Sequence, residues 1–147
     1  NATMLSAGYK HNVIPGQATA HVDGRFLPGH ESSFITTIED LAGPQVAVQK
    51  TIGARALEYE FSGDLVDAMT LALHRNDPGA HIAPYLMSGG TDAKAWDRLG
   101  ITGFGFTPLR LPADLDFTAL FHGIDERVPV DALQFGTRVL DDFLEQM

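Results

Sequence analysis

The stretch that decides the fold runs from Asn12 to Arg25 and reads NVIPGQATAHVDGR. Its first five residues predict a turn, because Pro15 fixes φ and Gly16 reaches conformations closed to other residues. The following segment, 17–27, alternates small or apolar residues with polar ones, and this period of two predicts a half-buried strand. Residues 3–10 predict a short strand before the turn.

The N-terminal part continues as a mixture of helix and strand. Apolar residues at helical spacing predict a helix over 32–41, with Ser32 or Ser33 as its N-cap. Apolar residues then predict a strand over 46–52 and a shorter one over 57–61. The order is therefore β-β-α-β with a last short strand.

The second half changes character near residues 62–64, where helices begin to alternate with short apolar strands. This alternation is typical of a parallel α/β sheet. We expect three helices, one over 65–74, a short one through Trp96 and Leu99, and one over 131–147 that Asp131 caps. We expect strands over 82–87 and 101–106.

Composition excludes several classes of protein. The 147 residues are 44% hydrophobic and 20% charged, which is an ordinary globular composition. A net charge of −9 without a basic stripe argues against a nucleic-acid partner. Cysteine is absent, so the chain has neither disulfides nor thiolate metal sites, which fits a cytoplasmic protein. No signal peptide and no apolar run of membrane-spanning length is present, so we expect no membrane association.

A glycine loop, Ser88–Asp92, joins the predicted strand 82–87 to a short helix. Ligands of parallel α/β sheets bind where strands end, and glycines let the backbone approach a ligand closely. The helix N-terminus would also attract an anion. The same spacing fits an ordinary turn in which Thr91 or Asp92 caps the helix, and spacing alone favours that reading.

His122 begins a second candidate loop, which continues Gly-Ile-Asp-Glu to Glu126. A histidine followed by acidic residues can bind a metal while a carboxylate orients its ring. A zinc site needs three or four protein ligands, however, and the other five histidines form no HxH, HxxxH or HExxH pattern. Either the chain binds no metal or the other ligands lie on another segment.

Three fragments occur in an order that resembles a known family. Asn12–Gly16, followed by a strand ending in Asp23-Gly24-Arg25, looks like the lid or dimerisation domain of aminoacylases, glutamate carboxypeptidases and succinyl-diaminopimelate desuccinylases. The loops Ser88–Asp92 and His122–Glu126 look like the C-terminal part of the catalytic domain in the same family of zinc metallopeptidases.

The resemblance covers the chain from Thr3 onward and implies a fold. It implies a partial ferredoxin-like α+β lid lobe over residues 3–61, followed by part of a zinc-peptidase α/β sheet with flanking helices over residues 62–147. Asn1-Ala2 resembles the remnant of a cleaved expression tag.

The resemblance also implies roles for residues that local patterns do not single out. Arg25 would pair with a substrate carboxylate, a task that suits a bidentate guanidinium. Gly89, Gly90 and Thr91 would hold the carboxylate or amide group of the substrate. Asn12 would lie near the scissile group as an oxyanion donor.

In the resembled family, two zinc ions are bridged by an aspartate and a water, and a glutamate is the general base. By resemblance, His122 is the one zinc ligand that the C-terminal segment supplies, and Glu126 orients it. The family's HxD motif, bridging aspartate, glutamate pair and lid histidine have no counterpart here.

We therefore expect a fragment of a metal-dependent amidohydrolase or exopeptidase that cleaves an amide bond next to a substrate carboxylate, as in an N-acyl amino acid or a dipeptide. The isolated chain would be inactive and would form a homodimer through its lid lobe. The alternative is a non-catalytic dimerisation or binding module from a truncated homologue.

Overall fold

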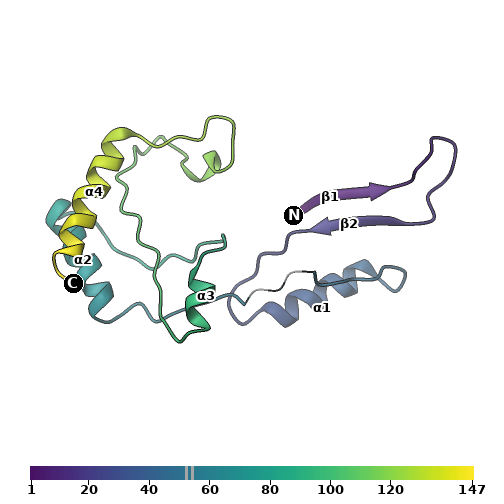
Figure 1. The fold of residues 1–147 in the computed structure, drawn as a ribbon, viewed down its shortest axis with the longest axis horizontal. Helices are drawn as coiled ribbons and strands as arrows, with labels where there is room; N and C mark the ends of the chain where they lie inside the picture. The colour runs from purple at the N-terminus through teal and green to yellow at the C-terminus, as the bar shows by residue number, and fades with distance from the viewer. Residues whose placement is uncertain (52, 54) are drawn as a thin grey trace. The chain divides into compact units, whose positions relative to one another are not determined.

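The computed structural model describes residues 1–51, 53 and 55–147 (Figure 1). It divides into two compact units. Unit 1 comprises residues 1–58 and 88–94, and unit 2 comprises residues 59–87 and 95–147. The glycine loop Ser88–Asp92 belongs to unit 1.

Unit 1 begins with a β-hairpin. β1 (Ala2–Ala7) pairs antiparallel with β2 (Ala18–Val22), with Leu5 opposite Ala20 and an irregularity between Ala2 and Met4. The turn region around Pro15 joins the two strands, as the sequence predicts, although both strands are shorter than predicted. These two strands form the one sheet found among the described residues.

Both faces of this hairpin reach solvent. Every residue of β1 and β2 is exposed, and Leu5 and Val22 keep 78% and 56% of their surface accessible. The prediction of a half-buried strand is therefore wrong for β2, whereas Asp23, Gly24 and Phe26 beyond it are half-buried. An alternating strand is buried on one face only where another layer covers that face, and the described residues place no such layer on β2.

Helix α1 (Glu31–Ala42) follows the hairpin and closely matches the predicted range. The predicted serine caps are wrong, because the N-cap is His30 and no side chain caps the helix. Instead, the Ser33 hydroxyl donates a hydrogen bond back to the His30 carbonyl at 3.0 Å. The helix ends at Gly43, whose φ of 75° lies in the left-handed region that glycine adopts without strain.

The strands predicted over 46–52 and 57–61 are not formed. Residues 46–51 and 55–61 have no regular secondary structure, and Ile52 lies outside the described residues. A strand is stabilised by hydrogen bonds to a neighbouring strand, and these segments do not pair with one.

Unit 2 is built on two helices that lie side by side (Figure 1). α2 (Asp64–Asn76) packs against α4 (Val130–Leu144), and their contact buries Ala72, Phe135 and Val139. Phe106 and Phe143 pack at the edge of this core with ring centroids 5.7 Å apart. The helical spacing read from the sequence thus identified both helices of this core, although Pro129, not Asp131, is the N-cap of α4.

The parallel sheet predicted for the second half is absent from the described residues. Segments 82–87 and 101–106 are irregular, and only α3 (Ala93–Asp97) and a 3-10 turn (Thr118–Leu120) lie between α2 and α4. The described part of the chain is therefore a small α+β protein with a two-stranded antiparallel sheet and four α-helices. Apolar runs become strands only when other strands pair with them.

None of the helices in the described ranges is long and apolar enough to cross a membrane.

Candidate functional site

The structure brings Arg25 to the glycine loop. The Nη1 group of Arg25 donates a hydrogen bond to the carbonyl oxygen of Ser88, which lies 63 positions further along the chain and directly precedes Gly89. Both residues belong to unit 1. The two fragments to which the family resemblance gives substrate-binding roles are therefore neighbours in space.

A second contact fixes the other edge of the same guanidinium. The Nε group of Arg25 donates to Oδ2 of Asp23 at 2.8 Å, and Nη2 lies 2.8 Å from the same oxygen. A guanidinium carries five N–H groups, so these contacts leave one N–H on each terminal nitrogen for a further acceptor. The side chain of Arg25 remains 54% exposed, so a ligand can reach it.

The local sequence explains why Asp23 and Arg25 meet. Residues two apart in an extended chain point to the same side. Gly24 between them faces Phe34 of α1, and a Cβ at Gly24 would lie 2.5 Å from the Phe34 ring. The Phe34 ring also packs against Phe26 with centroids 5.6 Å apart. The absence of a side chain at Gly24 thus lets α1 pack on the segment that carries the ion pair.

The glycine loop itself is exposed over residues 88–92. A Cβ at Gly90 would meet no atom within 4 Å, so the loop is not closed by neighbouring side chains. The backbone carbonyl of Thr91 accepts a hydrogen bond from the Lys94 amide at 3.4 Å, at the start of the short helix α3. Gly89, Gly90 and Thr91 are thus accessible to a ligand from solvent.

Asn12 lies in the loop between β1 and β2. It is exposed, and the neighbouring turn is closed by the Val13 amide, which donates to the Lys10 carbonyl at 3.3 Å. Among the contacts of the described residues, none joins Asn12 to Arg25 or to the glycine loop. Its role as an oxyanion donor stays a prediction.

His122 and Glu126 belong to unit 2 and are both exposed. His122 has a φ of 61°, in the left-handed region that residues other than glycine rarely adopt. The turn is closed by the Gly123 amide, which donates to the Leu120 carbonyl at 2.9 Å. Histidine enters this region more often than most residues, so the conformation marks a tight turn at this position.

A zinc site is not assembled by these residues. Within residues 1–51, 53 and 55–147, no three His, Cys, Asp or Glu side chains come close enough together to hold a metal ion. His122 offers one nitrogen donor, whereas a protein zinc site uses three or four ligands. The donor set of the described chain therefore does not fit the zinc centre that the family resemblance implies.

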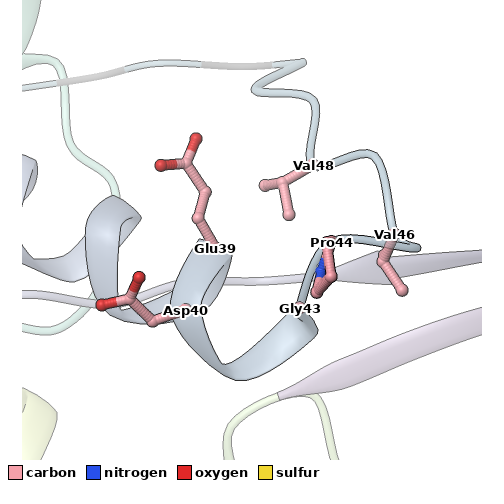
Figure 2. A pocket seen from close by; sticks show the side chains of 6 residues that line it. All are labelled: Glu39, Asp40, Gly43, Pro44, Val46 and Val48. Atoms are coloured by element: carbon pink, nitrogen blue, oxygen red, sulfur yellow. The ribbon is translucent and has the colours of Figure 1, made fainter.

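Two shallow hollows lie elsewhere on unit 1. The smaller, about 460 Å³, is lined by Glu39 and Asp40 from the end of α1 and by Pro44, Val46 and Val48 from the segment after it (Figure 2). Its charged lining groups are carboxylates, so it does not suit an anionic substrate. The larger, about 1010 Å³, includes Lys50 and Arg55 among its lining residues, and Lys50 pairs with Glu31.

Sequence reasoning missed the contact partner of Arg25. Asp23 was part of the motif but received no role, although an aspartate two positions before an arginine in an extended segment is a recognisable ion-pair spacing. The Ser88 carbonyl carries no sequence signal, because every residue has a backbone carbonyl.

Comparison with known families supports the family resemblance of the N-terminal part of the sequence. Residues 1–47 match the family model of the M20-type peptidase dimerisation domain. The match supports a relationship between residues 1–47 and the M20 peptidases, and the matched domain is by its description a dimerisation domain. It includes β1, β2 and α1, and it ends before the glycine loop and His122. Neither the curated proteins nor the solved structures contain a significant match.

Proposed function

We propose that this chain is part of an M20-type amidohydrolase or exopeptidase that cleaves an amide bond next to a substrate carboxylate, such as that of an N-acyl amino acid or a dipeptide. The observation that carries the proposal is the contact between Arg25 and the Ser88 carbonyl. It supports a site in which a guanidinium and a glycine loop receive one ligand. Guanidinium groups bind carboxylates through two parallel N–H···O bonds.

We assign the binding of the substrate to residues of unit 1. Arg25 would pair with the carboxylate, and the backbone amides of Gly89 and Gly90 with Thr91 would hold the same group or the adjoining amide. The exposure of Arg25 and of the loop is consistent with this role. Zinc is proposed for the longer protein alone, with His122 as one of its ligands and Glu126 orienting it.

A binding experiment tests the substrate class. Titration of the 147-residue chain with N-acetylalanine, followed by ¹H–¹⁵N NMR, should shift the amides of Gly89 and Gly90. N-acetylalaninamide, which lacks the carboxylate, should leave these amides in place at the same concentration. Equal shifts with both compounds would contradict a carboxylate site.

An activity experiment tests the role of the isolated chain. We expect the pure chain with added zinc to hydrolyse neither N-acetylated amino acids nor dipeptides, because the described residues assemble no zinc site. Sustained release of free amino acid by the pure chain, abolished by a chelator, would overturn this expectation.

The second candidate is a non-catalytic dimerisation module. The uncovered hairpin and the match of residues 1–47 to a dimerisation domain favour it. Sequencing the gene upstream of Thr3 separates the two candidates. An in-frame segment containing an HxD motif supports the hydrolase, and a stop codon directly before Thr3 supports the module.

A further inference from the structure

We propose that Asp23 is a positioning residue, which holds the Arg25 guanidinium in the orientation that receives a substrate carboxylate. The inference rests on the proposed function, because it assigns one more residue to the same site. Asp23 is not expected to touch the substrate. It acts through Arg25.

The contacts of Arg25 constrain the guanidinium from two sides. Asp23 engages the edge formed by Nε and Nη2, both 2.8 Å from its Oδ2 atom, while the Ser88 carbonyl engages Nη1. Because the group is planar, two anchors that involve three different nitrogens fix the direction of its plane. The N–H groups left on Nη1 and Nη2 then point in a fixed direction, as bidentate binding of a carboxylate requires.

The Ser88 contact distinguishes this arrangement from an ordinary surface ion pair. An exposed pair two residues apart contributes little to stability by itself. Here the same guanidinium also joins a loop 63 positions away, so Asp23 influences where Arg25 meets the glycine loop. An arginine without such anchors samples many rotamers, and ordering them on binding weakens affinity.

The packing of α1 supports the same reading. Phe34 occupies the space that a side chain at residue 24 would need, and its ring packs against Phe26. The backbone that carries Asp23 and Arg25 is therefore held by α1, and the pair is built on a supported segment.

The test uses the full 147-residue chain and two readouts. The first is the ¹⁵Nε–H signal of Arg25, assigned by its loss in Arg25→Lys. It should exchange slowly with water in the wild type and rapidly in Asp23→Ala. The second is the Kd for N-acetylalanine, which should rise roughly two- to five-fold in Asp23→Ala, in keeping with an exposed charge pair. Asp23→Glu should restore part of both.

A control variant separates positioning from general effects. Asp40→Ala removes one carboxylate from α1 in the same unit and should change neither readout. Unchanged backbone amide shifts in β1 and β2 of Asp23→Ala show that the hairpin is intact.

The outcomes distinguish this inference from the proposed function. If the wild type binds N-acetylalanine and Asp23→Ala binds it equally well, the positioning role is wrong and the carboxylate site stands. If the wild type does not bind N-acetylalanine at all, the assignment of a carboxylate site is wrong, and the positioning role is then wrong as well.

Discussion

Gly136 of α4 packs directly against the backbone of Pro108. A Cβ at Gly136 would lie 2.8 Å from the Pro108 carbonyl oxygen, closer than Cβ atoms approach an oxygen in real proteins. The close approach lets the segment after residue 101 lie on α4, where Phe106 contacts Phe143. One glycine thus determines how the irregular segment and the helix meet.

Gly136→Ala should destabilise unit 2. The added methyl group must push α4 and the Pro108 backbone apart, and overpacking of this kind costs about 1–3 kcal/mol. The better helix propensity of alanine offsets about 1 kcal/mol of this cost. We expect a net loss of roughly 1 kcal/mol in the free energy of unfolding, measured by urea denaturation. Gly105→Ala is the control, because nothing lies within 4 Å of a Cβ there, and equal effects of both variants would contradict the packing argument.

Phe135→Ala should be more damaging. Phe135 is 6% exposed and packs with Ala72 and Val139 between α2 and α4. Truncating a buried phenylalanine costs about 3–5 kcal/mol through lost burial and the cavity left behind. The matched control is Leu133→Ala on the same helix, where the side chain is 47% exposed and little changes. Thermal unfolding followed by circular dichroism compares the two, and a similar melting temperature for both variants would place the core elsewhere.

The helices were predictable because their signal is local. The apolar spacing in α1, α2 and α4 is contained within each segment, so the sequence alone indicates where each helix lies. The strands were less predictable because a strand depends on partners distant in the sequence. The apolar runs 82–87 and 101–106 have strand-like composition, but the described residues pair neither of them with another strand.

The candidate site was predictable only in part for the same reason. Family resemblance assigned binding roles to Arg25 and Gly89, which lie 64 positions apart in the sequence. Their proximity depends on a side-chain hydrogen bond to the Ser88 carbonyl, which no pattern of residue types encodes. For the zinc site, the resemblance identified one ligand position, His122. Among the described residues, however, no three potential ligands come close enough together to hold a metal ion.

Leu5→Lys should weaken self-association. The match to a peptidase dimerisation domain covers the hairpin, and Leu5 leaves 78% of its surface exposed on β1. A lysine there removes apolar contact and disfavours edge-to-edge strand pairing. We expect the wild type to sediment as a dimer at micromolar concentration and Leu5→Lys to shift toward the monomer by about tenfold or more in Kd, which corresponds to roughly 1.4 kcal/mol.

The control for the dimer is Leu144→Lys. Leu144 is 67% exposed on α4 in unit 2, outside the matched residues. It should leave the sedimentation profile unchanged. If Leu144→Lys dissociates the dimer and Leu5→Lys does not, the interface lies on α4 and the hairpin assignment is wrong.

His122→Gly and His122→Val should separate the backbone role of this position from its chemistry. His122 has a φ of 61°, which costs an L-residue roughly 1–2 kcal/mol and costs glycine almost nothing. Glycine loses more entropy on folding, by roughly 0.5–1 kcal/mol. His122→Gly should therefore leave the loop as stable as before or slightly more stable. A β-branched valine tolerates the left-handed region poorly, so His122→Val should open the loop. Limited proteolysis at residues 121–129 measures the difference, and equal cleavage of both variants would show that the left-handed turn is not maintained in solution.

Both variants lack the imidazole, so in a longer protein that binds zinc they should lose metal affinity alike. A loss of metal in His122→Val alone would assign the effect to the backbone and not to a ligand.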